Sequence, residues 1–124
     1  MVSRRTETRV KPITIDIEAS QLEDLKRRLA QTRWPEAETC AGWDQGMPLA
    51  YTQELAAYWL EAYDWRRFER RLNGWDNFST EIDGIDIHFI HRRSHNPDAL
   101  PLLITHGWPG SIVEFHKIID ALAD

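Results

Sequence analysis

The hydrophobic period of this 124-residue chain changes near Phe78, and that change limits the folds open to it. Before Phe78, apolar residues recur every three to four positions, as in helices that bury one face. After it, apolar and polar residues alternate on both sides of Asp83-Gly84, a pair that favours a two-residue β-hairpin turn. We therefore expect helices first and strands second, an α+β order for the piece taken by itself.

Three helices are expected before this change. The first opens at Ser20-Gln21-Leu22-Glu23, which has the pattern of a capping box. The second covers residues 47–63, with Pro48 near its first position. The third is capped by Asp64 and ended by Asn73-Gly74. Their inward faces are expected to be formed by Leu22, Leu25 and Leu29, by Leu55, Trp59 and Ala62, and by Trp65, Phe68 and Leu72.

The last third of the chain predicts a strand, a turn and a helix. The run "LLIT" at 102–105 is wholly apolar apart from its threonine, which is typical of a strand covered on both faces in a parallel sheet. Ser111-Ile112-Val113-Glu114 is a second capping-box pattern. The helix that it opens is expected to turn four apolar side chains inward: Ile112, Phe115, Ile119 and Leu122.

The turn between this strand and this helix, "THGWPGS" at 105–111, is the strongest candidate site. Ligand sites in open α/β sheets lie at the carboxyl ends of strands. Gly107 leaves the cleft free of a side chain, and Pro109 fixes its own φ and allows a cis bond before it. The Trp108 amide is then placed to face a developing oxyanion, a donor worth about 3 kcal/mol in a hydrolytic transition state, and its indole to form pocket wall. The alternative is a tight turn with no chemical role.

The segment "HGWPGS" resembles the H-G-x-P motif of epoxide hydrolases of the α/β-hydrolase fold. The upstream segments "ITIDI", "TRWP", "GWDQGMPLAY" and "FSTEIDGIDIHFIHRRS" are also similar to that family, in its microsomal-like branch. The resemblance implies an α/β protein with an N-terminal helical meander, followed by the first strands (a β-hairpin, then β-loop-α) of an incomplete α/β-hydrolase core. It also implies a flexible basic arm at 1–11, a helical N-terminal region at 12–76 and the start of the core at 77–124.

The family's reaction, as the resemblance implies it, has two steps. An aspartate opens the epoxide to form an ester while lid tyrosines donate to the epoxide oxygen, and a histidine then activates water to hydrolyse that ester. By resemblance, the Trp108 amide is one half of the oxyanion hole, and His106, Gly107 and Pro109 shape its loop. We expect no nucleophile, general base or lid within this chain. The resemblance implies no cofactor and a small apolar epoxide as substrate.

Two further patterns invite a different site. Gly42-Trp43-Asp44-Gln45-Gly46 matches a nucleophile elbow, but a loop-like segment precedes it, so Asp44 is expected in a turn between helices. Four histidines lie at 88, 91, 95 and 106, yet their spacing lacks the tight pairing of structural zinc ligands, and no metal is expected. His116 is expected at the surface.

Composition limits the partners. The net charge of −5 and pI near 5.5 argue against nucleic acid. The single cysteine, Cys40, fits a reducing compartment, and without a membrane-spanning run or a signal peptide we expect a cytoplasmic protein with no membrane partner.

Three functions remain open. The chain is the N-terminal portion of an epoxide hydrolase, or a non-catalytic binding or regulatory chain that pairs with a full-length relative, or a piece of another α/β-hydrolase of the esterase or dehalogenase type. Association with a C-terminal hydrolase part, or self-association through an exposed core, is expected because a bare strand edge invites pairing.

Overall fold

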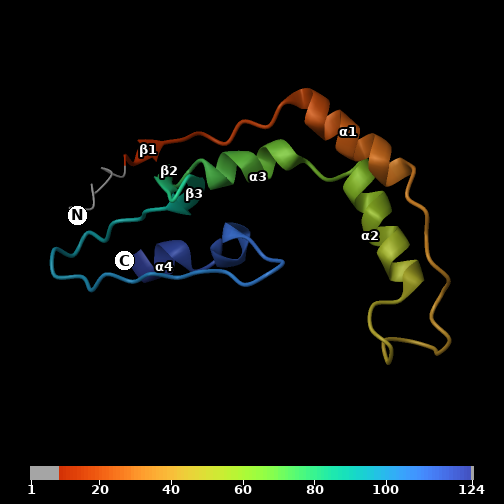
Figure 1. Cartoon of the computed structure of the whole chain (residues 1–124). Helices are drawn as coiled ribbons and strands as arrows, with labels where there is room; N and C mark the ends of the chain where they lie inside the picture. Colours follow the sequence, from red (N-terminus) through yellow and green to blue (C-terminus); the bar gives the residue numbers. More distant parts are fainter. Residues whose placement is uncertain (1–8, 124) are drawn as a thin grey trace. The chain divides into compact units, whose positions relative to one another are not determined.

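The structure, a computed structural model, describes residues 9–123 and contains helices and one small antiparallel sheet (Figure 1). It divides into two compact units. One comprises the residues up to Ile15 together with those from Phe68 onward, and the other comprises Asp16–Arg67. None of the helices within residues 9–123 is long and apolar enough to cross a membrane.

In the unit of residues 16–67, helix α1 runs over Ala19–Ala30. The predicted capping box is wrong, because the helix begins before Ser20: the N-cap position is Glu18, and no side chain caps it. The backbone carbonyl of Glu18 accepts from the amides of Gln21 and Leu22 instead. The predicted apolar face is confirmed, since Leu22, Leu25 and Leu29 are all partly buried and line one groove.

Helix α2 covers Leu49–Glu61, and Pro48 occupies its N-cap position. Its first amide is satisfied from a distance, because the Leu49 N–H donates to Oε2 of Glu38 at 2.9 Å. That hydrogen bond lowers the pKa of the Glu38 carboxyl. The inward face predicted for α2 is wrong: Leu55 and Trp59 are 47% and 44% exposed. The helix instead buries part of the side that carries Thr52, Ala56 and Leu60.

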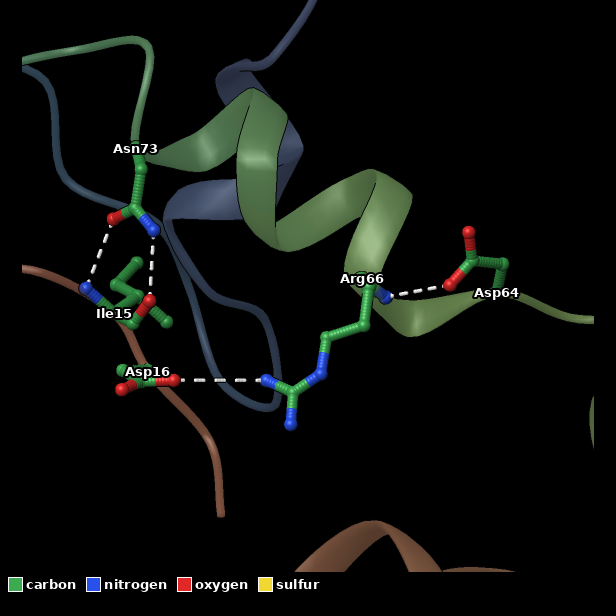
Figure 2. A network of polar contacts seen from close by, with 5 residues as sticks. All are labelled: Ile15, Asp16, Asp64, Arg66 and Asn73. Atoms are coloured by element: carbon green, nitrogen blue, oxygen red, sulfur yellow. Dashed lines mark hydrogen bonds and ion pairs between the residues drawn. The ribbon is translucent and has the colours of Figure 1, made fainter. Parts of the chain in front are cut away.

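Helix α3 covers Trp65–Leu72, and its predicted ends are confirmed. Oδ1 of Asp64 accepts from the Arg66 amide at 2.9 Å, which caps the helix (Figure 2). The Gly74 amide donates to the Arg71 carbonyl just past its end. Of its predicted apolar face, Leu72 is buried at 3% exposure.

The sheet has the order β1-β2-β3, and both pairings are antiparallel. Its strands are β1 (Lys11–Pro12), β2 (Asn77–Ile82) and β3 (Ile85–Ile90). The predicted hairpin is confirmed: Asp83 has φ 52° and Gly84 φ 80°, as a type I′ turn requires. Phe78 and Phe89 face each other in register, with ring centroids 5.6 Å apart.

Two asparagines hold the N-terminal segment and the sheet to the end of α3. The amide of Asn73 forms two hydrogen bonds with the backbone of Ile15, accepting from its N–H at 2.9 Å and donating to its carbonyl at 2.7 Å (Figure 2). Asn77 is 4% exposed, and its backbone carbonyl accepts from the Ile13 amide. Its Nδ2 donates to the carbonyls of Leu72 and Trp75, at 2.9 and 2.7 Å. Asn77 thereby satisfies a carbonyl at the C-terminus of α3 that the helix itself leaves open.

The C-terminal part differs from its prediction. Residues 102–105 form no strand, because no neighbouring strand within residues 9–123 pairs with them, and a strand needs such a partner to satisfy its backbone. The single predicted helix is divided into a 3₁₀ turn, η1 (Ile112–Phe115), and a short helix, α4 (Ile119–Ala123). Leu122 is 56% exposed rather than inward.

Three contacts attach this C-terminal part to the end of α3 and the residues after it. Nε1 of Trp75 donates to Oδ1 of Asp120 at 3.0 Å, and the guanidinium of Arg71 donates to the His116 carbonyl at 3.0 Å. His116, expected at the surface, is partly buried with its ring edge-on to Phe68.

Candidate oxyanion loop

The loop 105–111 contains a tight turn closed by one hydrogen bond. The Gly110 amide donates to the Gly107 carbonyl at 2.7 Å, and the Trp108-Pro109 peptide bond between them is cis. A cis-proline at the third position of a four-residue turn defines a type VI turn. The four residues from Gly107 to Gly110 therefore form one compact unit of backbone.

The Gly107 carbonyl has a second donor, which is the side chain of His106. Nδ1 of His106 lies 3.1 Å from this oxygen, and because a carbonyl only accepts, Nδ1 carries the hydrogen. Two donors thus hold one oxygen. Since a trans peptide is planar, with its N–H opposite its C=O, the Trp108 amide points away from both donors. In the part of the chain that the structure describes, this amide has no acceptor.

The side chain of Trp108 is 96% exposed. The indole of Trp108 therefore lies at the surface of this loop. A backbone donor held by its neighbours, with an aromatic ring beside it, can stabilise an oxyanion formed on an apolar substrate.

The exit of the loop confirms one part of the second capping box. Oγ of Ser111 accepts from the Val113 amide at 3.3 Å, so the serine caps η1 as predicted. The carboxylate of Glu114 does not complete the box. It lies instead over Gly110, in the space where any other residue would place its Cβ.

Asp44 lies outside any elbow. It belongs to a turn at 41–47 that has no strand before it, with positive φ at Gly42 and Gly46. The Gly46 amide donates to the Trp43 carbonyl, which closes this turn. The geometry agrees with the prediction of a turn between helices.

The four histidines are not gathered into a metal site. No group of three or more His, Cys, Asp or Glu side chains within residues 9–123 is arranged to hold a metal ion. Nε2 of His88 lies 3.0 Å from Oδ1 of Asn77. The Asn77 side-chain nitrogen already donates to the Leu72 carbonyl, so the oxygen faces His88. Because this oxygen only accepts, Nε2 of His88 is the donor. Partial burial of this ring lowers the pKa of His88 by disfavouring its charged form. His88 is therefore part of the Asn77 network.

The unit of residues 16–67 contains a groove of about 290 Å³. Leu22, Leu25 and Leu29 of α1 line one side, and Trp59 and Trp65 contribute to the other. The residues that line this groove include none of residues 105–111.

Sequence reasoning did not detect the contact between Gly110 and Glu114. The two residues are only four positions apart at a helix start, a spacing that could have indicated the contact. The capping-box pattern instead paired Glu114 with Ser111, whereas its carboxylate lies over Gly110. The roles of Asn73 and Asn77 were also missed, since their partners at Ile15 and His88 are distant in sequence.

Comparison with known proteins identifies the family. Residues 10–115 match the family model described as the epoxide hydrolase N terminus. The chain is 54% identical over 115 residues to a protein of Stigmatella aurantiaca named "Putative epoxide hydrolase", and 34% identical over 119 residues to epoxide hydrolase 1 of Sus scrofa. Each match covers 93% of this chain and 26% of the relative, so the chain spans about a quarter of the length of these relatives.

The solved structures agree. The epoxide hydrolase of Aspergillus niger superposes with a TM-score of 0.79 at 35% identity, covering 91% of this chain and 30% of that one. The juvenile hormone epoxide hydrolase of Bombyx mori gives 0.78 at 32% identity, covering 92% and 31%. The helices and three-stranded sheet match an N-terminal piece of an α/β-hydrolase, which confirms the predicted fold class. The chain therefore belongs to the epoxide hydrolase family, and it corresponds to that family's N-terminal region.

Proposed function

We propose that this chain is the N-terminal part of an enzyme that hydrolyses small apolar epoxides to diols through an aspartyl ester. Its contribution to the reaction is the loop 105–111. In this proposal, the Trp108 amide donates to the oxyanion that forms when water attacks the ester, and the Trp108 indole lines the substrate pocket. The nucleophilic aspartate, the general-base histidine and the lid are supplied by parts of the enzyme that this chain does not contain.

One observation carries the proposal: two donors hold the Gly107 carbonyl, so the amide on the same peptide has a fixed direction. A fixed donor needs no reorganisation when charge develops, and one such donor is worth about 10²- to 10³-fold in kcat. In this scheme His106, Gly107 and Pro109 position the amide and take no part in proton transfer. The reaction needs protein groups and water only, so no cofactor is invoked.

The same proposal covers the domain bounds of the chain, its association surface and its cellular location. Residues 12–76 form the helical N-terminal region, and residues 77–124 begin the hydrolase core. The exposed apolar side chains at Leu100, Leu102 and Leu103 (91%, 65% and 88% exposed) provide a surface for association with the remaining hydrolase part. A cytoplasmic location is proposed from the single free cysteine, Cys40.

A hybrid enzyme tests the function directly. In it, this chain replaces the matching segment of the Stigmatella aurantiaca relative, and the unmodified relative provides the reference rate. We expect the hybrid to convert styrene oxide to its diol and to leave p-nitrophenyl esters and haloalkanes unchanged. Epoxide turnover near the reference rate supports the proposal, because this chain then completes a site whose nucleophile, base and lid come from the relative. A folded but inactive hybrid, together with tight binding of the free chain to the unmodified relative, would favour a regulatory role.

A further inference from the structure

Gly110 is a glycine for a reason other than its backbone conformation. Positive φ angles among the glycines of residues 9–123 occur only at Gly42, Gly46 and Gly84, so Gly110 has a conformation that other residues adopt readily. What excludes a side chain at this position is space. A Cβ at residue 110 would overlap with Oε1 of Glu114 and lie 2.6 Å from its Cδ.

A second neighbour of the same position is the Gly107 carbonyl oxygen, 2.9 Å from where the Cβ would lie. This oxygen accepts from the Gly110 amide and from Nδ1 of His106. The Glu114 carboxylate could move aside at small cost because it ends a flexible side chain, but this backbone oxygen could not. A side chain at 110 would therefore push against the peptide that carries the Trp108 N–H.

Glu114 is directed back toward the turn by its own backbone. Its amide donates to the Ser111 carbonyl at 3.0 Å, in the first turn of η1. From there its side chain covers Gly110, with Oε1 in the space that a Cβ would fill. The Glu114 carboxylate and the Gly107 carbonyl oxygen thus both border the space beside the Gly110 Cα.

We propose that Gly110 and Glu114 are positioning residues for the oxyanion amide of Trp108. The bare Cα of Gly110 receives the Glu114 carboxylate, and this packing keeps the Gly107–Trp108 peptide in the orientation that its two hydrogen bonds define. The inference rests on the proposed function, because an oriented amide matters only where an oxyanion forms. Neither residue transfers a proton or contacts the substrate.

A double-mutant cycle in the hybrid enzyme tests this pair, with styrene oxide as substrate. We expect Gly110→Ala to lower kcat about 10- to 100-fold with KM within about 3-fold, since small misplacements of a catalytic donor are costly. Glu114→Ala is expected to lower kcat by about 3- to 10-fold through loss of the packing. The double variant should stay within about 2-fold of Gly110→Ala, because the methyl group already displaces the Glu114 carboxylate and still presses against the Gly107 carbonyl. Glu81→Ala, an exposed carboxylate on β2, is the control and should leave kcat within about 2-fold.

The outcomes separate the two proposals. If Gly110→Ala retains the kcat of the unmodified hybrid, or if the losses of the two single variants multiply in the double variant, the positioning role is wrong. If the unmodified hybrid folds but does not hydrolyse epoxides, the proposed function fails, and thermal unfolding of the same four proteins still tests the contact. In that case a double variant with the same Tm as Gly110→Ala supports the pair, and strictly additive Tm changes overturn it.

Discussion

Replacing Asn77 by alanine is expected to release the hairpin from the end of α3. The substitution removes three hydrogen bonds of a side chain that is 4% exposed: two from Nδ2, at 2.9 and 2.7 Å, and one to Oδ1, at 3.0 Å. At about 1 kcal/mol net for each bond, the loss is about 3 kcal/mol. The Leu72 carbonyl keeps the Trp75 amide as a donor at 3.2 Å, so no larger penalty is added there.

Hydrogen exchange followed by mass spectrometry measures this loss locally. In the hybrid enzyme, a loss of about 3 kcal/mol corresponds to roughly 100-fold faster exchange in peptides covering 77–90, provided that these amides exchange through local opening. Asn73→Ala is the matched control, because it removes two side-chain hydrogen bonds, both to Ile15, at an exposed site. Water can replace these bonds, so exchange is expected to be less than about 10-fold faster. Equal acceleration in the two variants would refute the argument that burial gives Asn77 its larger effect.

Three further predictions concern pH and the chain by itself. The folded-state pKa of His88 is lowered by burial, so its contribution to hairpin stability is present above its unfolded value of 6.5 and is lost as pH falls below it. After correction for the intrinsic pH dependence of amide exchange, hairpin protection should fall less between pH 7.5 and pH 5.5 in His88→Asn than in the unmodified hybrid. The pKa of Glu38 is lowered mainly by the Leu49 amide, so protection at the start of α2 should fall as pH drops below 4.5, and Glu38→Gln should remove that dependence. Within residues 9–123 the buried apolar side chains are Leu72, Trp75 and Ala123. The isolated chain should therefore bind a hydrophobic dye, self-associate and lack hydrolase activity. A monomer with one sharp unfolding transition in calorimetry would contradict this.

Features with local causes could be predicted from the sequence. The hairpin follows from Asp83-Gly84 because both positions need positive φ and the flanking residues alternate. The ends of α3 follow from Asp64 and Gly74, whose hydrogen bonds reach only two or three residues along the chain. The Ser111 cap belongs to the same class. In each case the residues that determine the structure are neighbours in sequence.

Features that depend on distant partners could not be predicted. The amide at the start of α2 is capped by Glu38, which lies 11 residues earlier, so no capping pattern marks it. Ser20 matched a capping box, yet the N-cap residue is Glu18, two residues earlier, where backbone hydrogen bonds to the Glu18 carbonyl suffice. Residues 102–105 have strand-like composition, but strand formation requires a paired neighbour, and composition does not provide one.

The sequence predicts the candidate site only as a loop, and the contacts within that loop are given by the structure. The motif predicts the Trp108 amide as the donor. The hydrogen bond from His106 to the Gly107 carbonyl and the contact of Glu114 with Gly110 depend on side-chain placement, which the motif does not give. These contacts explain how the direction of one amide is set.

The most direct test of the central claim replaces the amide of Trp108 by an ester. Incorporation of the α-hydroxy analogue of tryptophan at position 108 of the hybrid enzyme removes the N–H and keeps the indole. Single-turnover kinetics with styrene oxide then separate formation of the covalent ester from its hydrolysis. We predict that ester formation changes by less than about 3-fold, while hydrolysis slows about 10²- to 10³-fold and the covalent intermediate accumulates in the mass spectrum. Hydrolysis at the unmodified rate would contradict the assignment of Trp108 as an oxyanion donor.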